Sequence, residues 1–492
     1  MIIVEVRDYM SKVHLADESV IKVLKKFMYI ENDFWMRRSN PNIPRYKFLI
    51  TDSGAFLTGL LPRVSAVLKK YKVDFEIVDK RSIRTSPDIK DVKTFLKGMR
   101  VEGKRLKLRD YQLDSLVRGL QKTRGVYDLC TGAGKSVVMS ALITSWRRRT
   151  LVVVNSTSLA EQLRDDIAEF TQEPVGFIGS GIWDPKDVTV AIDRSLVSGR
   201  SRKRKKRAKE FLESIEYLIF DEVHHIQSKT WQNISAACEF ASIRHGFSGT
   251  PETSSYKTES GEGNQDEVME AHLGTVIHRI TVGELIEKGW LSRPIVNIIQ
   301  NEVYFDSNPL DYNEEYERII VKDEMRNRMI TNIMHAAAQE EKQTIGFVTR
   351  IAHGEILVDS LIHEYGLPED AVKFVHGDGY DRKGDIADFK QGATPILIGT
   401  VLNEGLNFFS HNGINCAAGK SSKQVRQKIG RILRKPRTET GDVDRESERV
   451  VNFWDFADGG HVWYYKHGRR RIRTYRADGH EVVRVDPDDI LK

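Results

Sequence analysis

Short apolar runs alternate with segments of helical periodicity along most of this chain. Between the runs, apolar positions recur at the three- and four-residue spacing of a helix, as in residues 137–145. Strand–helix alternation of this kind is typical of parallel α/β sheets, so we predict two such domains, joined near residues 285–300. The strands predicted from the apolar runs are 126–129, 151–154, 188–192, 217–220, 344–348, 372–375, 396–398 and 450–454.

Residues 1–90 carry the same signals on a smaller scale and predict a small α/β unit. Its strands are expected at 2–6, 46–50 and 75–78, and its helices around 20–28 and 64–71, the second with Pro62 near its first turn. The charged stretch 79–93 is interpreted as a linker, and the polar stretch 252–267 as an exposed loop. The predicted domains are 1–92, 93–290 and 291–492.

The composition is that of a globular protein. Apolar residues make up 40% of the 492 positions, which excludes a disordered or fibrous chain, and the length suggests about three domains. A net charge of +6 agrees with an anionic partner. Cys130, Cys238 and Cys416 are far apart, so they indicate neither a disulfide framework nor a zinc site. With no apolar signal-peptide segment and no membrane-length apolar run, we expect a cytoplasmic protein.

The first chemical signal is a glycine-rich turn between a predicted strand and a helix, Thr131-Gly132-Ala133-Gly134-Lys135-Ser136. Backbone N–H groups in such a turn can face a phosphate, and the helix N-terminus adds its dipole. Lys135 would reach the β- and γ-phosphates, and Ser136 would ligate Mg²⁺. The strict phosphate-loop pattern has Gly where this chain has Leu129, so an ordinary tight turn is the alternative.

A second signal is the sequence Asp221-Glu222-Val223-His224, directly after an apolar strand. A carboxylate at the end of a strand can hold the water shell of Mg²⁺, which we predict for Asp221. Glu222 could orient and deprotonate an attacking water. Adjacent acids are also common in solvated loops. We expect His224 to have a coupling role and His225 to be exposed to solvent.

The third signal is the basic segment 427–434, with Arg431 and Arg434 three residues apart. We predict that both lie on one face of a helix, from which guanidinium groups could stabilise a γ-phosphate transition state as arginine fingers do. A basic solvated helix is the alternative.

The order of these motifs resembles the superfamily 2 helicases, in particular their XPB-like, RecG-like and UvsW-type branch. The resemblance covers about residues 100–460 and implies two RecA-like parallel-sheet motor domains in tandem behind the small α/β domain, with ATP and Mg²⁺ as cofactors. Gln112 in the segment 108–112 matches the glutamine that reads adenine. Residues 131–136 resemble motif I, 151–162 motif Ia, 191–196 motif Ib, 221–224 a DExH motif II, and 247–251, with Ser248 and Thr250, motif III.

In the second half, residues 346–350 resemble motif IV, 376–382 the segment before motif V, 400–407 motif V, and 427–434 motif VI. The resemblance implies a catalytic role for Gln427 and a nucleic-acid contact for Thr400. Asn407 departs from the family, since many relatives have Asp there. The segment 280–294 resembles the connector common in this branch. Residues 1–90 resemble, more loosely, the small domain of UvsW-type phage helicases.

Three basic segments are candidates for nucleic-acid contacts. Residues 200–209 are almost all basic, which suits phosphate contacts, a solvated face or a nuclear import signal. Phe34 to Arg38 mix aromatic and basic types. In 463–476, arginines including Arg469 and Arg473 are interleaved with tyrosines. The candidates in 200–209 are Arg202, Lys203, Arg204, Lys205, Lys206 and Arg207.

These motifs together predict an ATP-dependent DNA helicase or translocase. By resemblance, its substrate is branched or forked DNA, in branch migration, fork reversal, recombination or repair, and it acts as a monomer or with replication or recombination proteins. A translocating restriction subunit, an RNA helicase and a catalytically silent nucleic-acid clamp are the alternatives. The resemblance places it in a bacterial cell or a phage-infected host, with a nuclear location left open.

Overall fold

The structure is a computed structural model that divides into two compact units, each described by itself below. The first unit holds Met1–Leu129 and Ala133–Ile280, and the second holds Cys130–Gly132 and Thr281–Lys492. The described residues are 1–83, 85–197, 201–249, 256–258, 261–263, 266–301, 311–377, 382–400, 402, 408–436, 443–459 and 462–491.

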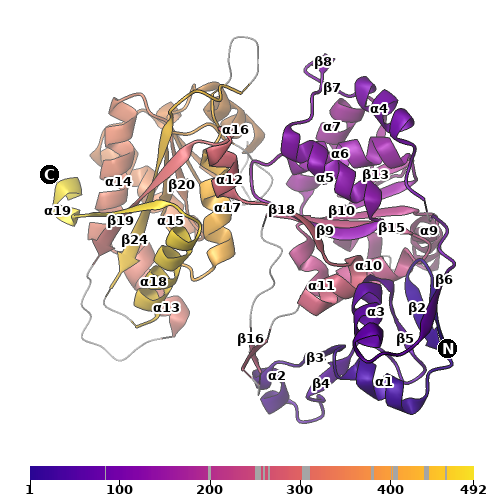
Figure 1. Cartoon of the computed structure of the whole chain (residues 1–492). Helices are drawn as coiled ribbons and strands as arrows, with labels where there is room; N and C mark the ends of the chain where they lie inside the picture. The colour runs from indigo at the N-terminus through magenta and orange to yellow at the C-terminus, as the bar shows by residue number, and fades with distance from the viewer. Residues whose placement is uncertain are drawn as a thin grey trace. The chain divides into compact units, whose positions relative to one another are not determined.

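An eight-stranded sheet forms the centre of the first unit, with the strand order β12-β11-β13-β10-β14-β15-β9-β18 (Figure 1). Neighbouring strands are parallel except for the edge pair β11 and β12. The strands are β9 (Arg124–Leu129), β10 (Thr150–Val154), β11 (Val175–Gly179), β12 (Ile182–Asp184), β13 (Val188–Ile192), β14 (Tyr217–Asp221), β15 (Ile243–Ser248) and β18 (Val276–Ile280). Strands β10 and β14 are buried along their whole length, so each contains a continuous apolar run, residues 151–154 and 217–220.

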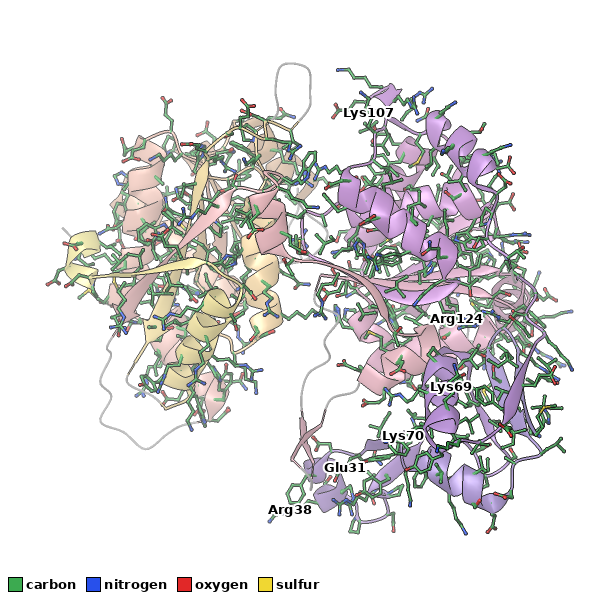
Figure 2. The ribbon with its side chains drawn as sticks, in the orientation of Figure 1. Glu31, Arg38, Lys69, Lys70, Lys107 and Arg124 are labelled. Atoms are coloured by element: carbon green, nitrogen blue, oxygen red, sulfur yellow. The ribbon has the colours of Figure 1, made fainter. Side chains whose placement is uncertain are left out.

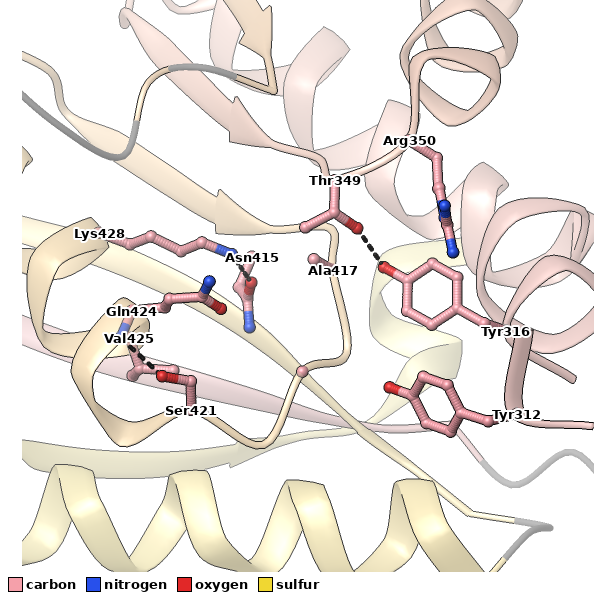
Figure 3. Close-up of a pocket in the computed structure, with 11 residues that line it drawn as sticks. Tyr312, Tyr316, Thr349, Arg350, Asn415, Ala417, Ser421, Gln424, Val425 and Lys428 are labelled. Carbon is pink, nitrogen blue, oxygen red and sulfur yellow. Dashed lines mark hydrogen bonds between the residues drawn. The ribbon is translucent and has the colours of Figure 1, made fainter. Parts of the chain in front are cut away.

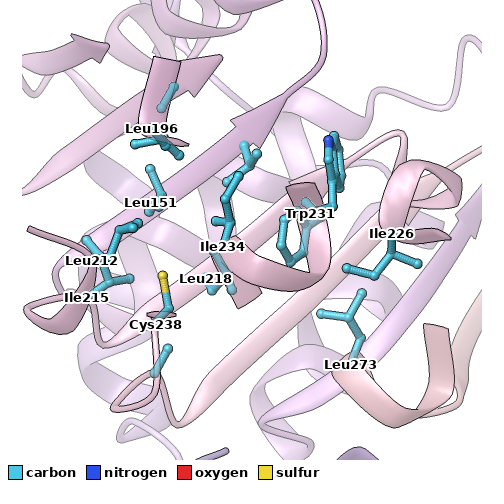
Figure 4. Close-up of a cluster of buried hydrophobic side chains, with 14 of the residues drawn as sticks. Leu151, Leu196, Leu212, Ile215, Leu218, Ile226, Trp231, Ile234, Cys238 and Leu273 are labelled. Atoms are coloured by element: carbon cyan, nitrogen blue, oxygen red, sulfur yellow. The ribbon is translucent and has the colours of Figure 1, made fainter. Parts of the chain in front are cut away.

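Helices cover both faces of this sheet (Figure 1). One group is α4 (Ile89–Gly98), α5 (Asp110–Gln121), α6 (Lys135–Trp146) and α7 (Thr157–Thr171). The other is α8 (Asp193–Val197), α9 (Arg202–Glu213), α10 (Lys229–Ala237) and α11 (Asp266–Leu273). Figure 4 shows the core between the second group and the sheet, where Trp231 and Ile234 of α10 pack with Leu151 and Leu218. Trp231 is held further by its indole N–H, which donates to Asp193 at 2.8 Å.

A separate four-stranded sheet, in the order β5-β2-β1-β6, is formed by the N-terminal residues. Strand β1 pairs with β2 antiparallel and with β6 parallel. The elements of this N-terminal part are β1 (Ile2–Val6), β2 (Met10–His14), α1 (Glu18–Lys25), β3 (Tyr29–Glu31), α2 (Phe34–Ser39), β4 (Tyr46–Phe48), β5 (Ala55–Leu57), α3 (Leu61–Lys70) and β6 (Phe75–Asp79), of which β3 and β4 pair with each other in a sheet of their own. Figure 2 shows Lys69 and Lys70 on α3 and Arg38 at the outer edge of this part of the unit.

This N-terminal sheet is packed onto the larger one. Ala271 of α11 belongs to the apolar core of the N-terminal sheet, and Arg63 forms an ion pair with Glu270 beside it. Asp8, which is 9% exposed, accepts hydrogen bonds from Ser82 and Ser242. Buried polar pairing of this kind fixes the two sheets of the first unit to each other.

The second unit contains a seven-stranded sheet in the order β21-β22-β20-β23-β24-β19-β25, and all of its strand pairs are parallel. The strands are β19 (Arg293–Asn301), β20 (Thr344–Phe347), β21 (Val372–Val375), β22 (Ile396–Gly399), β23 (Asn412–Asn415), β24 (Val450–Asp458) and β25 (Glu481–Val485). The helices are α12 (Val282–Glu287), α13 (Tyr312–Tyr316), α14 (Glu324–Gln339), α15 (Ile351–Asp359), α16 (Arg382–Gln391), α17 (Ser422–Ile432), α18 (Val462–Ala477) and α19 (Pro487–Leu491).

The α/β prediction is confirmed, with parallel sheets of the RecA-like kind in both units. Two local predictions were wrong. The stretch 79–93 is not all linker, because α4 begins at Ile89 with the Asp88 side chain accepting from Lys90 N. The stretch 252–267 contains the short strand pair β16 (Tyr256–Thr258) and β17 (Gly261–Gly263) and the start of α11. The three-domain division remains a prediction.

Candidate functional site

The glycine-rich loop follows β9, in which Val126, Tyr127 and Leu129 are fully buried, and leads into α6. Gly132 and Gly134 have φ angles of +89° and +78°, a region where a side chain would be strained. Gly134 is the N-cap of α6 and offers no side-chain cap, so the first N–H groups of the helix remain for an anion. Lys135 and Ser136 are half-buried in the first turn.

Two side chains from α5 hold this loop. Gln112, which is 4% exposed, donates from Nε2 to the carbonyl oxygen of Ala133 at 3.0 Å, and its Oε1 accepts from the backbone N–H of Arg109. The Tyr111 hydroxyl lies 3.1 Å from the same Ala133 oxygen. A Cβ added at Gly134 would lie only 2.5 Å from Gln112 Nε2, so glycine is required there for close packing as well as for its φ. Gln112 is therefore part of the phosphate-loop structure.

Glu222 is clamped at the carboxyl edge of the same sheet. One carboxylate oxygen, Oε2, accepts from the Ser248 hydroxyl at 3.2 Å and lies 3.4 Å from His224 Nδ1. The other oxygen, Oε1, lies 3.7 Å from Lys135 Nζ. Glu222 itself has a φ of +50°, a strained value for a residue with a side chain, and such strain is typical of functional sites. The structure thus brings together four residues predicted from three motifs.

Asp221 is the last residue of β14 and is 5% exposed. In the sheet, β14 lies next to β15, and β15 separates it from β9. Its Oδ1 accepts from the backbone N–H of Glu222 at 3.0 Å. A carboxylate at 221 and a hydroxyl at Ser136 are the oxygen ligands that Mg²⁺ prefers, with waters and phosphate oxygens completing its shell. The donors on this edge therefore fit ATP with Mg²⁺. Within the described part of the chain, no group of three or more His, Cys, Asp or Glu could hold a metal ion alone.

His225 was expected to be exposed, and this was wrong. It is half-buried, its Nε2 accepts from the Asn155 side-chain amide at 2.9 Å, and its ring lies 5.5 Å from that of Trp231. Asn155 follows β10, in the segment that resembles motif Ia. Neither Asn155 nor Tyr111 was predicted to have a role of its own. A polar residue directly after a buried parallel strand was the signal for Asn155, whereas nothing in its spacing distinguished Tyr111.

The basic helix of the second unit differs from its prediction. Arg431 is 6% exposed and lies on α17 with Gln427, which is 5% exposed. The helix ends at Ile432, and Arg434 is exposed in a β-bridge to Leu291. Arg431 and Arg434 therefore do not share a helix face. Leu433 is bridged to Phe409 and Arg434 to Leu291, so the chain leaves the helix after Ile432.

Two further motifs are described only in part. Thr400 follows β22, is half-buried and donates its backbone N–H to the carbonyl of Val375 at 3.1 Å. Thr250, Asn407 and Arg200 lie outside the described residues, as do the side chains of Trp35, Met36 and Arg382. Phe34 and Arg37 are half-buried on α2, while Arg38 is exposed.

The basic run between β13 and β14 forms the first half of α9. Its six candidate cations, residues 202–207, are all exposed, while Phe211 and Leu212 at the other end of the helix are buried in the core. Lys206 and Lys209 form exposed i,i+4 ion pairs with Glu210 and Glu213. Arg207 lies 5.0 Å from the ring of Trp183. The first turn carries three cations and no acid, an unfavourable arrangement for the helix dipole that suits a bound polyanion.

The arginine-rich tail forms α18, and its members divide into two groups. Arg469 and Arg473 are exposed, whereas Arg471 is 1% exposed and pairs with Asp455 at 2.8 Å. Tyr464 and Tyr475 are fully buried. The whole segment was interpreted as a strand-contacting surface, and this was wrong for Arg471, Tyr464 and Tyr475. The polar groups of these three side chains form hydrogen bonds inside the unit.

A cavity of about 220 Å³ opens beside α13 and α17 in the second unit. Figure 3 shows Tyr312, Tyr316 and Arg350 on one side of it and Gln424 and Lys428 on the other. Burial lowers the pKa of Lys428 to about 8, although Asp455 opposes that shift. The Lys428 ammonium donates to Asn415 Oδ1 at 2.7 Å.

The three cysteines are buried, and in the described part of the chain they form no disulfide bond. Burial raises the pKa of the Cys238 and Cys416 thiols to about 12, which makes them poor nucleophiles at neutral pH. In the described part of the chain, no helix is both long and apolar enough to cross a membrane.

Comparisons with known proteins agree with the geometry. A family model described as the res subunit of type III restriction enzymes matches residues 105–253. The ATP-dependent DNA helicase uvsW of Enterobacteria phage T4 is 24% identical over 503 residues, which covers 94% of each chain. The DNA 3'-5' translocase XPB2 of Sulfurisphaera tokodaii is 30% identical over 184 residues, 37% of this chain and 38% of that protein.

Among solved structures, S. cerevisiae Dbp5 bound to RNA and ADP BeF3 superposes with a TM-score of 0.53 at 16% identity, over 78% of this chain and 94% of that one. That likeness concerns the fold. The sequence relatives, the order of the motifs and the loop–carboxylate site together indicate an ATP-dependent enzyme, and the chain is similar to superfamily 2 helicases of the UvsW-type and XPB-like kinds.

Proposed function

We propose that this protein is an ATP-driven DNA translocase and helicase that acts on branched or forked DNA. The observation that carries the proposal is the clamp on Glu222, which joins Lys135 of the phosphate loop to Ser248 at the end of β15. A general base held between a phosphate-binding lysine and a residue on the neighbouring strand is what a hydrolase coupled to movement requires.

Each residue of this edge has a proposed part. Lys135 supplies positive charge to the nucleotide phosphates, and Ser136 and Asp221 hold the Mg²⁺ that ATP brings. Glu222 accepts a proton from the attacking water through Oε1, because Oε2 is engaged by Ser248 and His224. His224 and Ser248 act as positioning residues, and Gln112 keeps the loop closed against α5.

We also propose that hydrolysis needs the second unit. Arg431 lies in the segment that resembles motif VI, and arginine fingers contribute roughly 10³-fold or more in rate. Arg434, being outside the helix, is the weaker of the two candidates. Residues 1–280 alone should then bind ATP and hydrolyse it slowly. If that fragment hydrolysed ATP at the full rate, Arg431 would have no part in hydrolysis.

The preference for branched DNA rests on similarity to T4 uvsW over 94% of both chains. The alternative function with a specific observation in its favour is the translocating subunit of a restriction system. The family model of the type III restriction res subunit matches residues 105–253. Such a motor would move on duplex without separating strands. RNA remodelling and a silent clamp are the remaining alternatives.

The test is ATPase activity measured with single-stranded, duplex, forked and four-way DNA and with RNA, together with a strand-separation assay. Stimulation that is strongest with forks and four-way junctions, with branch movement, is the expected result. Stimulation by plain duplex without strand separation would favour the restriction motor. Stimulation by RNA alone, or turnover indifferent to nucleic acid, would contradict the proposal.

A further inference from the structure

In helix α18 the buried side and the exposed side carry different types of residue, and this separation is sharper than in α9, the other basic helix. The side of α18 that faces the sheet holds Tyr464, Gly468, Arg471 and Tyr475, all buried. On the opposite side, the described exposed residues are Tyr465, Lys466, Arg469, Arg470, Arg473, Arg476 and Ala477. Five of these seven are cations, and α18 contains no acid. We name Lys466, Arg469, Arg470, Arg473 and Arg476 the basic stripe.

The stripe follows from helix geometry. Its members are spaced by three and four residues, so they lie on one face and their side chains are neighbours. Ten residues separate Lys466 from Arg476, which at 1.5 Å per residue is about 15 Å. Like charges at this spacing repel one another. By contrast, α9 carries Glu210 and Glu213, which pair with its own lysines.

Buried contacts hold the stripe in place despite its repulsion. Arg471 donates to Asp455 at 2.8 Å and to the carbonyl oxygens of Phe456 at 2.6 Å and Gly419 at 2.9 Å. The Tyr475 hydroxyl donates to the same Asp455 carboxylate at 2.6 Å. The helix is therefore fixed by one face, and its cations are presented by a rigid element that a polyanion can bind with little ordering cost.

Aromatic side chains adjoin the stripe at its N-terminal end. Tyr465 is 53% exposed, with the Arg469 guanidinium 5.6 Å from its ring centroid. Tyr312 of α13 is 36% exposed and its ring lies 5.7 Å from that of Trp463. Tyr312 also lines the cavity of Figure 3. Exposed aromatic rings beside a row of cations are the means by which proteins stack unpaired bases while neutralising phosphates.

We propose that the basic stripe, with Tyr465 and Tyr312, is a binding surface for single-stranded nucleic acid, its phosphates on the cations and its bases on the rings. This inference rests on the proposed function, since a strand-separating motor produces single strands. A duplex would contact the cations but would offer no free base to the rings.

The test compares three full-length variants with wild type in binding a fluorescent oligothymidylate and a blunt duplex over a range of salt. The stripe variant is Lys466→Gln, Arg469→Gln and Arg473→Gln. Its matched control is Arg328→Gln, Lys342→Gln and Arg484→Gln, which removes the same charge from exposed positions elsewhere in the second unit. The third variant is Tyr465→Ser.

The stripe variant should lower the log–log salt slope for the oligothymidylate by roughly 0.7 per lost contact, about 2 in all, while the control keeps the wild-type slope. Tyr465→Ser should weaken binding of the oligothymidylate about fivefold or more at an unchanged slope, and leave the duplex unaffected. A stripe variant that matches its control would overturn the inference. Equal losses for duplex and single strand, with Tyr465→Ser silent, would overturn the single-strand assignment. Binding is measured without ATP, so failure of nucleic-acid-stimulated hydrolysis in wild type would contradict the proposed function separately.

Discussion

Arg470 and Arg471 are neighbours in sequence with opposite surroundings, and this difference can be measured. Arg471 is 1% exposed and makes three hydrogen bonds inside the second unit, whereas Arg470 is exposed. Burial alone would lower the pKa of Arg471, but attraction to Asp455 outweighs it and raises the pKa above its usual value. The pair is therefore a buried, charged anchor.

Arg471→Met should destabilise the second unit by about 3–5 kcal/mol, because it leaves Asp455 charged and buried without its cation. The lower end is expected, since Asp455 keeps three donors: the Tyr475 hydroxyl, the Asn415 amide and the Phe456 N–H. Arg470→Met should change stability by less than about 0.5 kcal/mol. Adding Asp455→Asn to Arg471→Met should recover much of the loss, because the unpaired charge is gone.

The measurement is hydrogen exchange of the α18 and β24 amides, read by mass spectrometry, which reports the opening free energy of these elements and not of the whole chain. A double-mutant cycle over positions 455 and 471 gives their coupling. If Arg471→Met and Arg470→Met differed by less than about 1 kcal/mol, the anchor would contribute nothing and the division of α18 into two faces would lose its energetic basis.

Four further outcomes are expected. Lys135→Ala should abolish ATP hydrolysis with the fold intact by circular dichroism, and near-normal turnover would remove Lys135 from the site. Glu222→Gln should still bind ATP but hydrolyse it about 10²- to 10⁴-fold more slowly, as a missing general base predicts; a failure to bind ATP would indicate a structural role instead. Replacing Arg202, Lys203, Arg204, Lys205 and Lys206 by Ser should reduce the salt slope of duplex binding by about 0.9 per lost contact, and an unchanged slope would make α9 a solvated face. Burial lowers the pKa of Lys428 to about 8, so between that pH and about 10.4 the unfolded state binds more protons than the folded state, and the contribution of Lys428 to stability rises with pH. The free energy of unfolding of wild type relative to Lys428→Met, measured with urea, should therefore increase with pH over that window. A difference that stays constant with pH would refute the lowered pKa.

The strands predicted from the sequence are those with a short, mostly apolar run, and they include the edge strand β21, whereas the interior strands β15, β19 and β23 were missed. Strand β13 was predicted to the residue, because four of its five side chains are apolar and Thr189 is its one polar residue. Strand β15 was missed because Arg244 and His245 break its apolar run. Both are fully buried, Arg244 through bonds to Ser235 and the Ala241 carbonyl, and His245 through the Tyr217 hydroxyl at 2.9 Å. Polar residues satisfied inside a core carry no periodic signal.

The residues of the candidate site also fall into two groups, those that the sequence predicted and those whose position depends on tertiary contacts. Lys135, Glu222, His224 and Ser248 were each found from a motif, and the parallel sheet brings them together because the carboxyl ends of parallel strands share one edge. Where a helix ends depends on tertiary contacts, so Arg434 was assigned to a helix that the bridge at Leu433 terminates. Likewise, no local pattern distinguishes Arg471 from Arg469, because the difference is made by Asp455 on a strand that precedes α18.

The anchor at Asp455 also ties the basic stripe to the helix that carries Arg431. Asn415 donates to Asp455 at 2.9 Å and accepts from Lys428 of α17 at 2.7 Å, while Arg471 of α18 holds the other carboxylate oxygen. Arg426 of α17 binds Asp478 at the end of α18 through two bonds of 2.8 Å, and Thr474 bonds Ser422 at 2.9 Å. Because these links hold α17 from Ser422 to Lys428, a displacement of the helix that bears Arg431 must displace the basic stripe with it. If nucleotide hydrolysis moves α17 and the basic stripe binds a nucleic-acid strand, both events would then involve the same movement of α17 and α18 as one rigid pair.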